Sequence, residues 1–188
     1  YVGLAGAIMA AGTGLAVFAR EKRNKCEDFL LVKPLRRGAV FGWKLLACFG
    51  ILVVFNALYL SAVLAAYAAN GAGPEGYARV ALAGASLFFL QMVYLSIAVL
   101  YATLAKKVRS VSGTGMAMGF AGFLLMALHS LTEEEAVRWA SPLEYFSPAQ
   151  VLATGGYEAK YALTGAAVAV VCLVLAFWHY CRSDARAV

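Results

Sequence analysis

Charged residues are scarce in this chain. Only 14% of its 188 residues are charged, while 63% are hydrophobic, whereas about a quarter of the residues of a soluble globular domain carry charge. Asp, Glu, Lys and Arg are absent from the interior of five long apolar runs. This pattern excludes an ordinary soluble domain. It also disfavours a proton- or sodium-coupled carrier, because such carriers usually place charged residues at mid-membrane.

Residues suited to metals, disulfides or nucleotides are also few. The chain has two histidines, His129 and His179, at opposite ends of the predicted spans, and four cysteines without metal-ligand spacing: Cys26, Cys48, Cys172 and Cys181. The stretch 113–115 lacks the Gly-Lys-Ser/Thr of a phosphate-binding loop. We therefore expect no catalytic residue, no metal and no cofactor bound by this chain. An intramembrane enzyme is the least favoured interpretation.

Five apolar runs are long enough to cross a membrane. A bilayer's hydrocarbon core is about 30 Å thick and needs about 20 helical residues to span it. Unpaired backbone groups inside hydrocarbon cost several kcal/mol, so these runs should be helices. The prediction is one all-α membrane domain, residues 1–188, with five transmembrane helices at about 2–19, 45–69, 80–105, 111–131 and 161–180.

The connections differ in charge and predict the orientation. Most of the 16 lysines and arginines lie in residues 20–44, in residues 106–109 or in the C-terminal tail, whereas Glu133 to Glu135 and Glu158 lie on the other side. Basic loops usually stay in the cytosol, so the C-terminus should be cytosolic and Tyr1 outside. An outside start predicts a further helix ahead of Tyr1, giving six in the intact subunit. The net charge of +6 is then a topology signal and needs no nucleic acid.

Inside the runs, a few polar and small residues are candidates for function. Asn56 and Gln91 could hydrogen-bond between helices or line a translocation path. Gly115, Gly119 and Gly122 share one helical face, which predicts close helix packing within the subunit or in a dimer interface.

The loop of residues 20–44 carries the most information. It is charged first, then apolar from Phe29 to Val32, and is broken by Pro34. This order is typical of a short amphipathic helix on the membrane surface, but it also fits a basic loop that only sets orientation. The residues alone leave both interpretations open.

At this loop the sequence resembles the permease subunits of ATP-binding-cassette exporters of the ABC-2 type. Those subunits carry, after a membrane helix, a glutamate, a stretch ending in Leu-Leu, a proline, an arginine and a lysine that opens the next helix. The matching residues here are Glu21, Leu30, Leu31, Pro34, Arg37 and Lys44. Residues 141–148 and the ending 180–184 also resemble the family, so the resemblance covers nearly the whole chain.

The resemblance implies a multi-pass permease of the cell membrane without catalysis of its own. Phe29, Leu30 and Leu31 would dock on a cytosolic ATPase subunit, and ATP and magnesium would bind to that partner. Glu21 and Arg37 would pair with the ATPase or cap the loop, and Lys44 would anchor the next helix at the headgroups. A second permease copy or paralogue, in the lipid bilayer, would complete the exporter.

Two further expectations concern the outer side and the alternative function. The extracellular segment 132–160 is too polar to span, and Ser147-Pro148 is typical of a helix start. Similar permeases place short helices there as an outer gate, while a plain loop is the alternative.

The alternative function is a membrane scaffold or assembly factor that recruits another cytosolic protein through loop 20–44.

Overall fold

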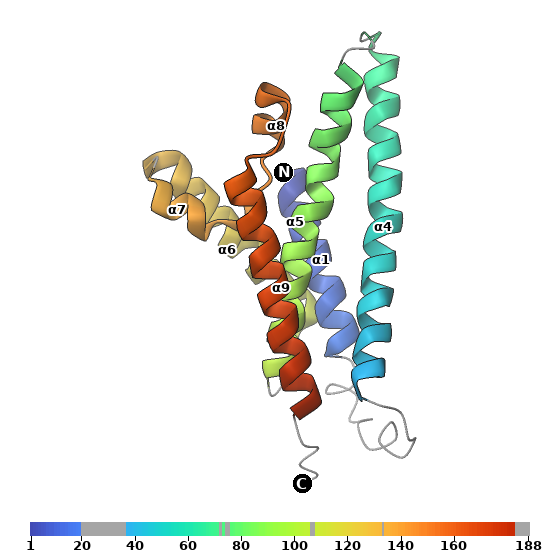
Figure 1. Cartoon of the computed structure of the whole chain (residues 1–188), viewed down its shortest axis with the longest axis vertical. Coiled ribbons are helices and arrows are strands. Elements are labelled where there is room, and N and C mark those ends of the chain that lie inside the picture. Colours follow the sequence, from blue (N-terminus) through green and yellow to red (C-terminus); the bar gives the residue numbers. More distant parts are fainter. Residues whose placement is uncertain (20–36, 72, 74–75, 106–107, 133, 183–188) are drawn as a thin grey trace.

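The computed structural model describes residues 1–19, 37–71, 73, 76–105, 108–132 and 134–182. Every regular element in those ranges is helical (Figure 1). The elements are α1 (Val2–Phe18), α4 (Arg37–Ala69), α5 (Tyr77–Leu104), α6 (Val111–Thr132), α7 (Glu135–Ala140), the 3-10 turn η2 (Pro142–Glu144), α8 (Pro148–Thr154) and α9 (Ala159–Arg182).

Four of these helices, α4, α5, α6 and α9, are long and apolar enough to cross a membrane. The first, α1, is apolar but has only 17 residues. At 1.5 Å per residue it is about 25 Å long, less than the roughly 30 Å of a hydrocarbon core. The expected five spans are thus four long apolar helices and one shorter helix, as befits a multi-pass membrane protein.

Helix α5 lies at the centre of the bundle and packs against α1, α4 and α9. Over its most apolar stretch, 61% of the residues are buried, whereas α4 buries only one narrow side. The rest of α4 exposes large apolar side chains, among them Trp43, Leu46, Val54 and Leu58. In a bilayer such a surface meets lipid or another membrane helix, so its exposure is no defect of packing.

Figure 1 shows the two ends of the bundle, which differ in their charged residues. One end holds the end of α1 and the start of α4, together with Arg37, Lys44, Arg109 and Arg182; we call it the basic end. The other holds the α4–α5 turn, α7, η2 and α8. All described glutamates lie there: Glu134, Glu135, Glu144 and Glu158. We call it the acidic end.

Helix α4 begins at Arg37 and not at Leu45. Residues 37–44 therefore form its first two turns rather than the end of the expected loop. The prediction ended the span at its first charge, but a helix of 33 residues is about 50 Å long and extends beyond the hydrocarbon. Its end can therefore carry Arg37 and Lys44. Likewise, α5 begins at Tyr77 and includes Arg79.

Short helices fold the segment that was expected to lie outside, residues 132–160. Helix α8 starts as the sequence predicts, with Ser147 before it and Pro148 in its first turn, although the Ser147 side chain makes no capping bond. It ends at Gly155, whose φ of 78° is the left-handed conformation that glycine adopts most easily. Helix α8 is followed directly by α9 in the order of elements.

Candidate coupling joint and translocation elements

Aromatic side chains from three helices meet at the basic end. The ring of Phe41, on α4, lies with its centroid 5.1 Å from that of Phe18, at the end of α1. It also lies 5.4 Å from Phe177 and 5.5 Å from Tyr180, both on α9. These separations are those of favourable edge-on aromatic pairs. Phe41 thus links α1, α4 and α9.

Lys44 belongs to the same cluster. Its Nζ lies 5.6 Å from the ring centroid of Phe18 and 5.5 Å from that of Tyr180. A cation over two aromatic faces is attracted by both rings, so Lys44 adds a charge to an otherwise apolar contact. We call these five residues the aromatic joint: Phe18, Phe41, Lys44, Phe177 and Tyr180.

A polar contact ties α4, α5 and α1 within the membrane-spanning part. The Asn56 side-chain amide donates to Gln91 Oε1 at 2.5 Å and to the Leu52 carbonyl at 2.8 Å. Gln91 Nε2 faces the Met9 sulfur at 3.8 Å. Gln91 is fully buried, while Asn56 is half-buried. The structure thus brings the two predicted polar residues into direct contact.

The three predicted glycines form the buried face of α6. A Cβ at Gly115 would lie 3.3 Å from the Gly12 nitrogen of α1, and one at Gly119 would clash with Ile8. A Cβ at Gly122 would clash with the Tyr94 hydroxyl of α5. Glycine is therefore needed here for close helix contact. The contacts are made within this chain.

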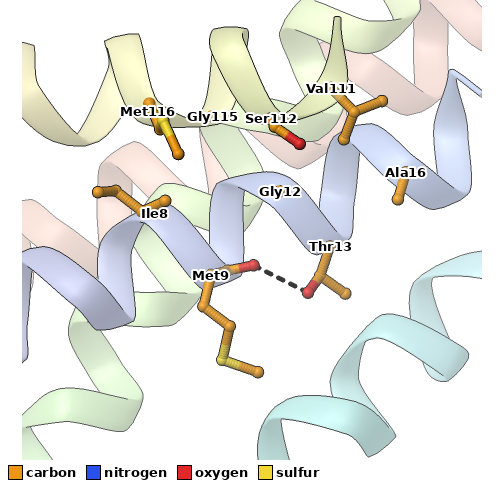
Figure 2. A pocket seen from close by; sticks show the side chains of 9 residues that line it. All are labelled: Ile8, Met9, Gly12, Thr13, Ala16, Val111, Ser112, Gly115 and Met116. Atoms are coloured by element: carbon orange, nitrogen blue, oxygen red, sulfur yellow. Dashed lines mark hydrogen bonds between the residues drawn. The ribbon is translucent and has the colours of Figure 1, made fainter.

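Beside this face, α1 and α6 line an open groove of about 420 Å³. Ile8 and Met116 lie between the two helices, as Figure 2 shows, and Thr13 donates to the Met9 carbonyl at 2.8 Å. The remaining lining is apolar or small, with Ser112 as the other hydroxyl. None of the described residues that line the groove is charged.

At the acidic end, Arg138 of α7 connects several elements. Its Nη2 donates to Gln150 Oε1 of α8 at 2.7 Å and to Glu158 Oε1, just before α9, at 3.1 Å. Its guanidinium carbon also lies 3.8 Å from the ring centroid of Tyr161 on α9. We call Arg138, Gln150, Glu158 and Tyr161 the Arg138 cluster.

Two tyrosines fix the same segment to the backbone. Burial raises the pKa of the Tyr145 hydroxyl, which stays protonated and donates to the Trp139 carbonyl at 2.5 Å. Burial also raises the pKa of Tyr157, whose hydroxyl donates to the Leu82 carbonyl of α5 at 2.5 Å. The second bond attaches the approach to α9 to the central helix.

The sequence-predicted coupling residues divide into two groups. Glu21, Phe29, Leu30, Leu31 and Pro34 lie outside the described residues, whereas Arg37 and Lys44 lie in the first turns of α4. Sequence reasoning missed the aromatic joint and the Arg138 cluster. An arginine in a segment rich in acidic and aromatic residues was the available signal for the second. Among the described residues, no group of three His, Cys, Asp or Glu side chains could hold a metal.

The family comparison agrees with this arrangement of apolar helices. A family model described as "ABC-2 family transporter protein" matches residues 1–185. The chain belongs to the ABC-2 transporter family. No curated protein and no solved structure matches it. The resemblance seen in the loop is thus confirmed over nearly the whole chain. As an ABC-2 protein, the chain is a membrane component of a family that lacks an ATPase domain.

Proposed function

We propose that this ABC-2 chain is the permease subunit of an ATP-driven exporter, which forms the translocation path and is driven by a separate cytosolic ATPase subunit. The basic end faces the cytosol, and a second permease copy or paralogue completes the path. ATP and magnesium bind to the ATPase subunit. The aromatic joint carries this proposal, because it connects both flanks of the coupling segment to the membrane helices.

The connection works through the ends of α1 and α4. Phe18 is the last residue of α1, and α4 begins at Arg37, so the segment between them starts and ends beside the joint. Packed aromatic rings resist being pulled apart, since closely packed contacts lose dispersion energy over small separations. A displacement of the coupling segment by Phe29, Leu30 and Leu31 against the ATPase would therefore move α1 and α4 together. Phe177 and Tyr180 extend the movement to α9.

Asn56 and Gln91 serve mainly as a tie between helices in this proposal. Gln91 is fully buried within the subunit, and its side-chain oxygen accepts a hydrogen bond from Asn56. Only the half-buried Asn56 could also reach a translocation path. The exposed groove between α1 and α6, with its uncharged lining, suits an apolar or amphipathic cargo better than an ion.

Co-purification tests the proposal. The full chain is expressed with a candidate ATP-binding-cassette ATPase subunit from the same organism, and ATPase binding is measured in lipid nanodiscs. We expect the variant Phe29→Asp/Leu30→Asp/Leu31→Asp to lose the ATPase, because three charges would replace the apolar docking side chains. The control Lys106→Gln/Lys107→Gln removes charge from the other basic loop and should keep it.

Two results would overturn the proposal. One is an intact chain that binds no ATPase; the other is a triple variant that binds the ATPase and supports ATP hydrolysis like the unaltered chain. Function that persists without ATP would instead favour the membrane scaffold or assembly factor.

A further inference from the structure

Arg138 joins two parts of the chain that have different main packing partners. Helix α6 packs mainly on α1 and is followed along the chain by α7, whereas α8 and α9 pack on α5. In Figure 1 the far end of α6 and α7 stand to one side of α9. Arg138 reaches from α7 to α8 through Gln150 and to the start of α9 through Glu158. Among the described residues, Arg138 is thus one of the side chains that fasten the α6–α7 arm to the rest of the acidic end, together with Trp139, whose ring packs on that of Tyr161 with centroids 5.2 Å apart.

The contact is strong enough to hold the arm and polar enough to be released. The Arg138 side chain is only 14% exposed, and that of Glu158 is 34% exposed. Hydrogen bonds to charged groups in such surroundings are stronger than those between neutral groups. Unlike aromatic packing, they can be exchanged for water when the segment moves. A contact with these properties suits an element that must alternate between closed and open.

We propose that Arg138, through Glu158, Gln150 and Tyr161, is a latch that holds α7 against the start of α9, and that this latch opens when the acidic end opens during transport. The first half concerns the isolated chain, and the second rests on the proposed function. Arg138 is a positioning residue here, since its described contacts are with Gln150, Glu158 and Tyr161 of this chain.

The chain offers a matched control that spans the same two helices. Lys160 of α9 and Glu135 of α7 form an ion pair at 3.8 Å, but their side chains are 55% and 78% exposed. Exposed pairs contribute little, because water and salt screen them. Removing the Glu135 charge therefore changes the charge between α7 and α9 but leaves the Arg138 contacts in place.

Ser141 supplies a reporter for opening. It follows α7, is fully buried, and its Oγ has no hydrogen-bond partner among the described residues. Replacement of this hydroxyl by a thiol, Ser141→Cys, keeps the side-chain size and breaks no hydrogen bond seen here. The thiol can react with a polar maleimide only when the segment opens, so its labelling rate reports the open fraction.

The first measurement uses the purified full chain in lipid nanodiscs. Labelling of Ser141→Cys is compared in three backgrounds, Arg138→Gln, Glu158→Gln and Glu135→Gln, and labelling of the parent chain without the reporter is subtracted for the native cysteines. Relative to the reporter chain with the latch intact, we expect roughly tenfold faster labelling in Arg138→Gln and Glu158→Gln, the factor for losing a charge-assisted hydrogen bond. The rate in Glu135→Gln should equal that of the reporter chain. If Arg138→Gln does not fold, Glu158→Gln decides, because it keeps the size of the side chain. Equal rates in all three backgrounds would overturn the latch.

The second measurement adds the ATPase subunit and ATP. Labelling should accelerate in the otherwise unaltered reporter chain but change little in Glu158→Gln, where the latch is already open. If the ATPase binds and hydrolyses ATP without changing the labelling rate, latch opening is not part of the cycle. If no ATPase binds, the proposed function fails, while the first measurement still decides whether the latch exists.

Discussion

The two ends of the bundle are held together by different combinations of contacts. At the basic end, Phe18, Phe41, Phe177 and Tyr180 pack ring against ring. The acidic end also packs rings, such as Phe146 on Phe89 and Trp139 on Tyr161, but it adds directional ties: Arg138 to Glu158 and Gln150, and the hydroxyls of Tyr145 and Tyr157 to backbone carbonyls. Aromatic packing keeps helices together as they move, whereas hydrogen bonds can be exchanged one by one with water.

This difference fits a model in which the basic end receives a displacement from the ATPase and the acidic end opens in response. A stiff contact suits the basic end, where the coupling segment meets the membrane helices in our proposal. Releasable contacts suit the acidic end, where short helices would have to open. The following predictions test whether the contrast in contact type is also a contrast in energy.

The largest effect is expected at the aromatic joint. Phe41→Ala removes a ring that is only 4% exposed and touches three others, so the free energy of unfolding should fall by about 3 kcal/mol. Phe49→Ala on the same helix is the control, because Phe49 is 40% exposed and, within the described part of the chain, its ring pairs with that of Phe88 alone. It should cost about 1 kcal/mol or less. Denaturant unfolding in micelles measures both. Equal losses would mean that the joint is no stiffer than the helix surface.

The glycine face of α6 comes next, because α6 runs from the basic end to the acidic end. A Cβ at Gly119 would clash with Ile8 of α1, so Gly119→Ala should lower the free energy of unfolding by about 2 kcal/mol through overpacking. Gly12→Ala is the control: no side chain or neighbouring backbone lies within 4 Å of its Cβ position, and alanine favours helix. A tolerated Gly119→Ala would show that α6 moves freely against α1.

Much of the fold could be predicted because its cause is local. The long spans follow from charge-free runs, and α8 follows from Ser147-Pro148. The start of α4 was placed late because the run was ended at its first charge, although a helix can carry Arg37 and Lys44 where it leaves the hydrocarbon.

The joint and the latch could not be predicted in the same way. Phe18, Phe41 and Phe177 are three aromatic residues among many, and nothing in an apolar run tells which of them meet. Asn56 and Gln91 could be singled out, since polar residues in the spans are rare, but their 2.5 Å contact needed the structure. Arg138 and Glu158 become neighbours only after two short helices and a turn reverse the chain.

A smaller effect is expected for the hydrogen bond between Asn56 and Gln91, which lies in the membrane-spanning part between the two ends. Asn56→Leu, Gln91→Leu and the double variant form a mutant cycle, whose coupling free energy should be about 0.6 kcal/mol, the average for hydrogen bonds between membrane helices. Denaturant unfolding of the four proteins gives this value, and transport assays show whether function follows stability. No coupling, together with a loss of transport in Asn56→Leu alone, would instead place Asn56 on the translocation path.

The smallest loss of stability should come from changing Glu135. The size of this loss measures how much an exposed charge pair alone contributes at the acidic end. The partner of Glu135, Lys160, also lies 5.0 Å from the Tyr161 ring centroid, so the pair is better tested by changing the glutamate. Glu135→Gln should lower the free energy of unfolding by less than about 0.5 kcal/mol, and added salt should abolish the difference between variant and parent. Glu158→Gln should cost more and keep most of its effect in salt, because its partner Arg138 is nearly buried. If salt abolishes both effects alike, the acidic end is held by general charge attraction, and the contrast with the aromatic joint is one of screening rather than of specific, releasable bonds.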